Sequence, residues 1–279
     1  MNGIGSDKQK IIVRGGGDLA TGVVQKFYRS GFKVLILETQ TPTAIRRGAA
    51  LCEAIYDGVA RVEDVECRKI NAVDECEDCW QENLVPLLID PDGKSIKDIK
   101  PDAVIDAIIA KKNLGTTIDM ASITIALGPG FEAGKDVHAV IETKRGNDLG
   151  LLILKGCAEP DTGIPGEIAG ESLRRVIYAP AEGVITHIKQ IGSIVEQGES
   201  LFTIDNIRPN GMGARSTKIQ ATMSGLLRGS IREGLWVHKG MKIADIDPRT
   251  DINWQAISDK ARSLGGAALE AYFLLKHKG

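Results

Sequence analysis

A glycine-rich turn between two apolar runs constrains this chain more than any other feature. The apolar run at residues 11–13 leads into three consecutive glycines, Gly15 to Gly17. An amphipathic segment, 23–31, and a second apolar run, 34–37, follow, and Glu38 closes the second run. The pattern predicts a strand, a tight turn, a helix, a strand and then an acidic residue. This order is typical of the front of a dinucleotide-binding βαβ unit.

Each small residue of the turn has an expected role in holding a phosphate. Gly15 permits the sharp turn, Gly17 lets the backbone approach a phosphate, and Ala20 lets the helix pack closely on the strand. Glu38 lies 21 residues after Gly17, near the spacing of an acid that binds ribose hydroxyls. We therefore predict a nucleotide site in which Glu38 accompanies the whole turn: Gly15, Gly16, Gly17, Asp18, Leu19, Ala20 and Thr21.

Asp18 leaves an alternative open. Its carboxylate stands where a pyrophosphate would rest, and would repel it unless the side chain caps the helix instead. The alternative is an empty or repurposed turn on the same scaffold.

Composition and charge exclude several classes of protein. The formal net charge is −2, so no basic footprint points to nucleic acid. No apolar run is long enough to span a bilayer, and residues 1–10 lack a signal-peptide core. An odd number of cysteines, five, without dense spacing fits a reducing cytoplasm. We expect a cytoplasmic protein that binds neither nucleic acid nor membrane.

Other strand ends and loops of the first half supply further site candidates. Ligands of open α/β sheets gather at the carboxyl ends of strands. The apolar strand 101–110 ends near Asp106, Lys111, Lys112 and Asn113, and the strand 123–127 runs into a second glycine-rich loop. Ordinary surface charge is the alternative reading of the two lysines. The binding candidates outside the first turn are Glu38, Arg46, Lys111, Asn113, Gly128 and Gly130; for Arg46 the alternative is a solvated helix face.

Two further patterns invite a chemical reading. His138 and Glu142 share a face of the strand 137–143 and could form an acid–base or metal pair, although a structural histidine is the expectation we favour. Cys76 and Cys79 form a C-x-x-C among four carboxylates, which should raise the thiol pKa values. No second cysteine pair completes a zinc set, so no metal site is predicted.

The second half of the chain contains an internal repeat. Residues 179–205 recur as 221–247, at an offset of 42 residues without gaps, and glycines stand at matching turns. Two such copies interlocking predict a small all-β barrel-sandwich that looks like the biotinyl/lipoyl carrier module. The place of the modifiable lysine reads 204–209, Ile-Asp-Asn-Ile-Arg-Pro, so covalent biotin or lipoate is not expected.

The remaining C-terminal segment, from Thr250 to Lys276, has apolar residues at helical spacing, with an interruption expected at Gly265–Gly266. Such a helix must dock on the sheet or on another copy of the chain. The predicted fold class is α/β. It comprises a Rossmann-like parallel-sheet domain over 1–173, a barrel-sandwich over 174–249 and a C-terminal helix over 250–279.

Several of these motifs, taken together, resemble the YqeB family. They are 15–22, Gly-Gly-Gly-Asp-Leu-Ala-Thr-Gly; 42–47, Pro-x-x-Ala-Ile-Arg-Arg; 106–113, Asp-Ala-Ile-Ile-Ala-Lys-Lys-Asn; 127–134, Leu-Gly-Pro-Gly-Phe-x-Ala-Gly; 137–146; and 162–166. The resemblance implies an accessory protein of the selenium-dependent molybdenum hydroxylase system, distantly similar to XdhC-type maturation factors. It implies a pathway and no particular reaction.

The resulting hypothesis is maturation of a molybdenum hydroxylase partner. The chain would bind NAD or another nucleotide, or molybdopterin dinucleotide, at the glycine-rich turn. Two alternatives stay open. One is an NAD-dependent oxidoreductase with His138 or Lys111 as proton donor, and the other is a non-catalytic scaffold for the hydroxylase. For chalcogen transfer the thiols to consider are Cys52, Cys76, Cys79 and Cys157, and none is expected to be a persulfide site.

Overall fold

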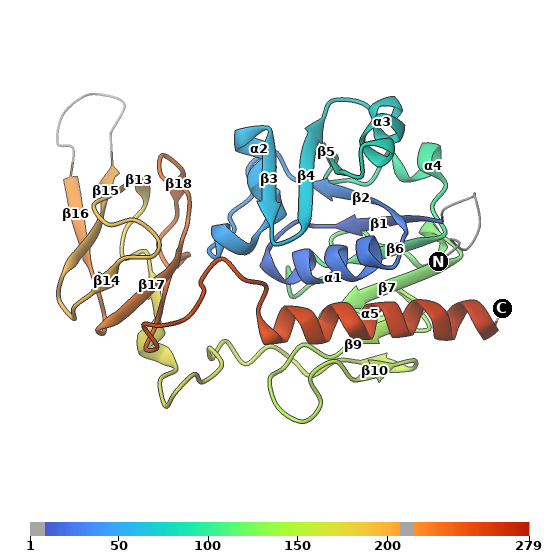
Figure 1. The fold of residues 1–279 in the computed structure, drawn as a ribbon. Helices are drawn as coiled ribbons and strands as arrows, with labels where there is room; N and C mark the ends of the chain where they lie inside the picture. Colours follow the sequence, from blue (N-terminus) through green and yellow to red (C-terminus); the bar gives the residue numbers. More distant parts are fainter. Residues whose placement is uncertain (1–8, 207–214, 279) are drawn as a thin grey trace. The chain divides into compact units, whose positions relative to one another are not determined.

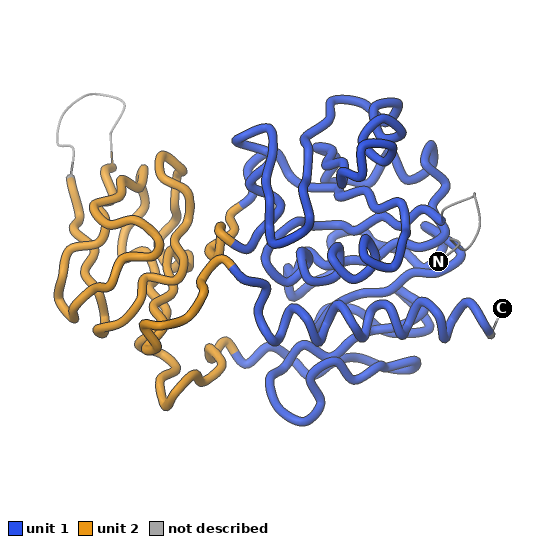
Figure 2. The backbone as a smooth tube through the Cα atoms, viewed as in Figure 1, with its two compact units in different colours: residues 1–42, 49–162, 256–279 blue, residues 43–48, 163–255 orange. Residues whose placement is uncertain are grey.

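The computed structural model describes residues 9–206 and 215–278. The chain divides into two compact units, and both draw on separate stretches of sequence (Figure 2). The first unit contains residues 1–42, 49–162 and 256–279, and the second contains 43–48 and 163–255. The C-terminal segment therefore returns to the unit that the N-terminal segment begins.

The first unit is built on one nine-stranded sheet, in the order β10-β9-β7-β6-β1-β2-β5-β4-β3 (Figure 1). A separate two-stranded sheet pairs β8 with β11. The strands are β1 Lys10–Arg14, β2 Lys33–Glu38, β3 Val59–Val62, β4 Val65–Ile70, β5 Val85–Ile89, β6 Ala103–Asp106, β7 Ile123–Leu127, β8 Glu132–Ala133, β9 Ala139–Ile141, β10 Leu152–Ile153 and β11 Gly156–Cys157.

Both ends of the large sheet are antiparallel, while its seven central strands pair in parallel. The two residues between β3 and β4 allow only a hairpin, because parallel neighbours need a crossover connection. The predicted α/β Rossmann-like parallel-sheet domain is therefore wrong: the sheet is mixed. Its crossovers also carry few long helices, since the connections from β6 to β7 and from β7 to β9 contain no α-helix.

The two long helices cover one face of this sheet. They are α1, Asp18–Arg29, and α5, Asp259–Lys278, and they lie side by side (Figure 1). A Cβ on Gly22 would lie 2.2 Å from the Ala261 carbonyl oxygen, and one on Gly265 would lie 2.3 Å from the Gly22 carbonyl oxygen. The helices thus cross at Gly22 and Gly265, where a side chain on either glycine would clash with the other helix. Gly265 does not interrupt α5, contrary to the sequence prediction, because it serves this crossing.

Strand alternation separates two cores on the two faces of the sheet. Ile11 and Val13 belong to the core beneath α1 and α5, whereas Ile12 belongs to the core on the opposite face. The elements α2 Ala54–Asp57 and η2 Leu51–Glu53 contribute to the core beneath α1 and α5, and the 3₁₀ turn η1 Arg47–Ala49 precedes them in the chain. On the opposite face lie α3 Cys76–Gln81, α4 Ile96–Ile99 and the 3₁₀ turns η3 Val73–Glu75 and η4 Ile118–Met120, whose apolar residues join the core on that face. Arg14 and Asp106 continue the alternation of Ile12 and Val104, so their side chains lie on this second face.

The second unit consists of two four-stranded antiparallel sheets, β12-β19-β17-β14 and β16-β15-β13-β18. The elements are η5 Leu173–Arg175, β12 Val176–Tyr178, β13 Gly183–His187, β14 Ile194–Val195, β15 Ser200–Asn206, β16 Arg215–Gln220, β17 Gly225–Ser230, β18 Trp236–Val237 and β19 Lys242–Asp247. The repeat is visible in the pairing, since β14 of the first copy joins β17 of the second and β18 of the second joins β13 of the first.

The predicted biotinyl/lipoyl-like barrel-sandwich is also not the architecture found. Two strands outside the repeat, β12 and β16, extend the sheets, so the unit is a pair of four-stranded sheets and not two bare copies. Part of the hairpin tip that lacks a modifiable lysine, residues 207–209, lies outside the described residues, as do residues 1–8. Within the described ranges, no helix combines the length and apolar character needed to cross a membrane.

Candidate functional site

The glycine-rich turn lies at the carboxyl end of β1, between the ends of β2 and β6. Gly15 has φ +95°, and a Cβ there would meet the Ala107 carbonyl oxygen at 3.0 Å. The Gly15 N–H donates to the Leu37 carbonyl oxygen at 2.8 Å, which fixes the turn to β2. Gly15 is thus required by the close approach of the segment after β6, as well as by its positive φ.

Gly17 differs from its two neighbours. It is the N-cap of α1 with φ −64°, its carbonyl accepts the Thr21 N–H and hydroxyl, and no side-chain cap is present. A Cβ on Gly17 would meet nothing within 4 Å. The first turn of this twelve-residue helix is therefore uncapped by a side chain at Gly17 and open above its Cα, where backbone N–H groups and the helix dipole favour an anion.

Glu38 does not stand free to bind a ribose. Its Oε2 accepts the Gly16 N–H at 2.8 Å, and its Oε1 accepts the Thr39 N–H at 2.7 Å. Burial raises the pKa of this carboxyl group, although the two backbone hydrogen bonds act in the opposite direction. Glu38 thus holds the turn to the end of β2, and a ribose could use only its remaining lone pairs.

Lys260, a residue that the sequence did not single out, brings positive charge toward Asp18. It lies in the first turn of α5, and burial lowers its pKa, as does nearby Arg145, while Asp18, Glu142 and Asp259 act to raise it. Among the hydrogen bonds of the described residues, none engages its ammonium group. Asp18 therefore interacts electrostatically with the ammonium group of Lys260. Nothing in the sequence could signal this, because it depends on α5 packing beside α1.

A buried ion pair lies beneath the same edge. Arg14 and Asp106, 1% and 2% exposed, are 3.8 Å apart, and Thr116 connects them. The Arg14 guanidinium donates to the Thr116 hydroxyl and, at 2.7 Å, to the Pro91 carbonyl oxygen; Thr116 in turn donates to Asp106 at 2.6 Å. Burial raises the pKa of Asp106 despite these partners. Asp106, a sequence candidate, therefore holds Thr116 and the buried guanidinium of Arg14.

The predicted residues of the loop after β6 have local partners. Lys111 forms an ion pair with Asp161 at 2.6 Å. The Asn113 carboxamide oxygen accepts two backbone N–H groups, those of Gly115 and Thr116, and its nitrogen donates to the Thr116 carbonyl oxygen. Asn113 therefore shapes this loop, and Lys111 ties it to Asp161.

The second glycine-rich loop is packed against that same segment. A Cβ on Gly130, which has φ +105°, would lie 2.5 Å from the Lys112 Cα, and one on Gly128 would lie 2.7 Å from the Thr143 hydroxyl oxygen. Both glycines are thus needed for the approach of neighbouring loops. The structure brings Gly15, Lys112 and Gly130 into adjacent loops, as the strand-end argument predicts, but gives Gly128 and Gly130 a packing role.

His138 and Glu142 do not form a pair. The Nδ1 of His138 accepts the Thr124 backbone N–H at 3.0 Å, which in the neutral ring leaves the proton on Nε2, and burial lowers the pKa of the imidazole. The Glu142 carboxylate accepts the backbone N–H groups of Lys144 and Glu159, both at 2.7 Å. His138 also lies before β9, at the amino end of the parallel strands, away from the turn.

The remaining sequence candidates lie elsewhere. Arg46 belongs to the second unit, where its guanidinium donates to the Trp254 carbonyl oxygen at 3.5 Å. Cys52, Cys76 and Cys79 are buried, and burial raises their pKa values, which makes poor nucleophiles. Cys157 is exposed. No group of three or more metal-binding side chains occurs in the ranges that the structure describes.

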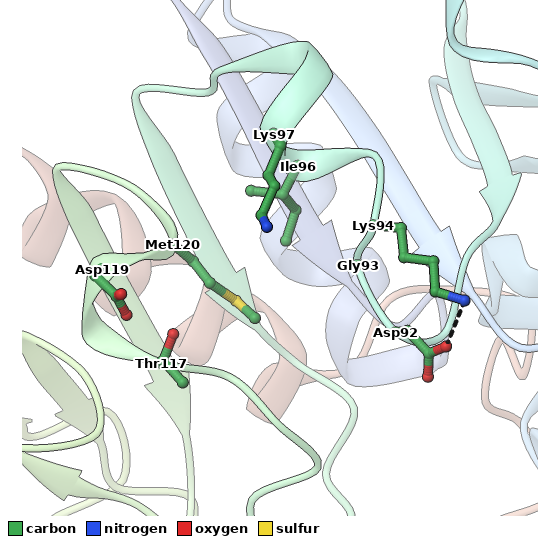
Figure 3. A pocket seen from close by; sticks show the side chains of 8 residues that line it. All are labelled: Asp92, Gly93, Lys94, Ile96, Lys97, Thr117, Asp119 and Met120. Carbon is green, nitrogen blue, oxygen red and sulfur yellow. Dashed lines mark ion pairs between the residues drawn. The ribbon is translucent and has the colours of Figure 1, made fainter.

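A pocket of about 410 Å³ opens on the second face of the sheet (Figure 3). It lies near Arg14, since a Cβ on Gly93, which lines the pocket, would be 3.8 Å from the Arg14 Nε. The segment after β5 and the segment around η4 line it: Asp92, Gly93, Lys94, Ile96, Lys97, Thr117, Asp119 and Met120. Sequence pattern does not indicate this pocket, because its two walls meet only in the folded chain.

Comparison with known proteins supports one family. No family model matches the chain. The uncharacterized protein YqeB of Escherichia coli strain K12 is 44% identical over 275 residues, which is 98% of this chain and 49% of that protein. The chain is therefore related to the YqeB family. It spans about half the length of this relative, and the relative's name carries no activity.

Two solved structures show a weak likeness. A succinylglutamate desuccinylase/aspartoacylase from Rhodobacter sphaeroides has a TM-score of 0.29 and 11% identity, over 86% of this chain and 85% of that one. A succinylglutamate desuccinylase from Silicibacter has a TM-score of 0.27 and 11% identity, over 86% and 84%. TM-scores of this size do not establish a common fold, and they say nothing of activity.

Proposed function

We propose that this chain binds the phosphate of a nucleotide or of molybdopterin dinucleotide at the turn 15–21, as an accessory protein in the maturation of a selenium-dependent molybdenum hydroxylase. Binding and delivery, not catalysis by this chain alone, are the proposed tasks. The hydroxylase link rests on the sequence resemblance to the YqeB family, so the partner and the pathway are part of the proposal.

The observation that carries the binding proposal is the open N-terminus of α1. The fold does not require a glycine at position 17, because φ is −64° there and nothing lies within 4 Å of a Cβ at this position. A missing side chain that packing does not require is what close approach of a phosphate would explain. Lys260 supports the proposal, because its half-buried ammonium lies near Asp18 and would offset the charge of that carboxylate.

The oxidoreductase alternative receives no support from the geometry. Burial lowers the pKa of His138, which is bound to Thr124 and lies at the opposite end of the parallel strands. Lys111 is exposed and paired with Asp161. His138 is therefore away from the turn, and Lys111, whose loop adjoins the turn, is engaged by Asp161, so we do not propose hydride transfer.

Titration calorimetry tests the proposal with NAD, ATP and molybdopterin cytosine dinucleotide. We expect one of these ligands to bind the wild-type protein. Gly17→Ala should lower the affinity for that ligand about tenfold or more, because a methyl group enters the phosphate position. Gly266→Ala is the matched control, since Gly266 has no positive φ and also has nothing within 4 Å. The proposal fails if none of the three binds, or if both variants bind equally well.

Co-purification with the hydroxylase tests the accessory role. We expect the complex to depend on the ligand that binds at the turn. A complex that forms equally with Gly17→Ala and without ligand would instead indicate a scaffold, and no complex at all would remove the hydroxylase from the proposal.

A further inference from the structure

The pocket on the second face of the first unit is built by two fixed walls. One wall is the segment 90–97 after β5, and the other is the segment 114–120 that ends in η4. Arg14 ties them together, because its guanidinium donates to the Pro91 carbonyl oxygen in the first wall and to the Thr116 hydroxyl in the second. A buried arginine that joins two loops leaves the space between them preformed.

The first wall is also fixed internally. The Asp90 carboxylate accepts the backbone N–H groups of Lys94 and Ser95 and the Ser95 hydroxyl, at 2.6–3.0 Å. These hydrogen bonds hold the pKa of Asp90 below its ordinary value, against the effect of burial. The turn that carries Gly93 and Lys94 is thus held in one conformation before any ligand arrives.

The floor of the pocket is apolar and faces a thioether. Ile96 of α4 is 4% exposed and forms the floor, and Met120 of η4 projects toward it from the other wall (Figure 3). A methionine sulfur makes favourable contacts with aromatic rings. An isoleucine floor beside a thioether therefore suits a flat ring better than a branched polar ligand.

The polar groups around this floor favour a neutral ligand. Two lysines and two aspartates line the pocket, so their formal charges cancel, and Lys94 is already paired with Asp92 at 3.2 Å. Lys97 extends over the floor from α4, opposite Thr117 and Asp119 (Figure 3). The ammonium group of Lys97 can donate to a carbonyl oxygen of a ligand, and the Asp119 carboxylate can accept neighbouring N–H groups of that ligand. A hydrogen bond from Thr117 lowers the pKa of Asp119.

We infer that this pocket binds a planar heteroaromatic ring whose edge carries a carbonyl group beside two adjacent N–H donors, as in guanine and pterins. Asp119 accepts the N–H donors, Lys97 donates to the carbonyl oxygen, and the ring lies between Ile96 and Met120. An adenine edge offers only one such donor beside an acceptor nitrogen, which the carboxylate would repel. The inference goes beyond phosphate binding at the turn and does not depend on it.

The experiment uses ligands without phosphate on the full chain. Guanosine and adenosine are titrated by calorimetry, and 6-hydroxymethylpterin is titrated by quenching of its own fluorescence. We expect guanosine or the pterin to bind, adenosine to bind roughly tenfold more weakly or not at all, and Asp119→Asn to weaken the bound ring roughly tenfold or more. Whichever of guanosine and the pterin binds more tightly identifies which of the two ring types the pocket binds.

Asp98→Asn is the matched control, because Asp98 lies on α4 next to Lys97 and does not line the pocket. The Asp98→Asn variant should bind guanosine or the pterin with the same affinity as wild type. The inference is overturned if neither ring binds at millimolar concentration, if adenosine binds as well as they do, or if both Asn variants weaken binding equally. Loss of guanosine or pterin binding in Asp119→Asn with intact phosphate-ligand binding separates this pocket from the turn. Unchanged nucleotide affinity in Gly17→Ala would contradict the function proposed for the turn and would leave the inference about the pocket standing.

Discussion

The two glycine-rich loops at the carboxyl edge of one sheet look alike in sequence and differ in what requires their glycines. In the loop 128–130, both glycines have positive φ and neighbours closer than 3 Å to a Cβ. In the turn 15–17, Gly15 has a positive φ and tight contacts and Gly16 has tight contacts, but Gly17 has neither. A glycine that the fold does not need is the better sign of a ligand, and this comparison singles out Gly17.

The largest effect is expected from the arginine that precedes the turn. Arg14→Met leaves Asp106 buried and charged without its partner, which should lower the free energy of unfolding by about 3–5 kcal/mol. Urea denaturation measures the change. The double variant Arg14→Met/Asp106→Leu removes the orphaned charge and should recover part of the loss. A loss below about 1 kcal/mol in the single variant would show that Arg14 does not stabilise the segments of Pro91 and Thr116 that it contacts.

Gly130→Ala should show that the second loop is required by packing. A positive φ and a Cβ 2.5 Å from the Lys112 Cα together predict a loss of roughly 2–4 kcal/mol in unfolding free energy. Gly134→Ala is the control, because Gly134 has φ +86° with nothing within 4 Å, so only the conformational cost of roughly 1–2 kcal/mol applies. Equal losses would mean that loop contact contributes nothing.

Glu38→Gln tests how the turn is held. Because the folded pKa of Glu38 is raised above its ordinary 4.5, its contribution to stability is fully present below pH 4.5 and is lost as pH rises through the folded pKa. Wild type should therefore exceed Glu38→Gln in stability most at acidic pH, by roughly 1 kcal/mol, with the difference shrinking toward neutral pH. Urea denaturation from acidic to neutral pH measures this stability difference. A difference that grows as pH rises would contradict the raised pKa of Glu38 in the folded state.

Gly17→Ala should have the smallest effect on stability. An N-cap glycine at φ −64° accepts a methyl group at a cost of at most about 1 kcal/mol. Thermal unfolding should therefore show little change, while ligand affinity falls. A large loss of stability would mean that Gly17 serves the fold, like Gly130, and would remove the contrast between the two loops.

Local sequence pattern was enough to predict the turn, α1, the central strands and the internal repeat. Periodicity and glycine spacing report on neighbours along the chain, and these elements depend on such neighbours. The wrong fold class came from extending parallel pairing to the sheet edges, where the hairpin at Glu63–Asp64 turns the chain back. The sequence also could not show that α5 belongs to the first unit, because Gly22 and Gly265 meet only in the folded chain.

The site was predictable only where it follows one strand end. The turn and Asp106 were predicted in this way, whereas the position of Lys260 and the pocket at Asp119 depend on segments that meet only in the folded chain. Gly128, Gly130 and Asn113 also have local packing or hydrogen-bonding roles, which the sequence could not separate from binding because close packing and ligand approach favour the same residue types. Only the distances around each glycine separate the two causes.

The most direct test of the central claim is amide chemical-shift mapping of the labelled chain with whichever phosphate ligand binds in the titrations. If the turn holds the phosphate, the backbone N–H signals of Gly17, Asp18 and Leu19 will shift with the ligand, and those of Gly128 and Gly130 will not. Shifts of equal size in both loops, or no shift at Gly17 with a saturated ligand, would contradict the account.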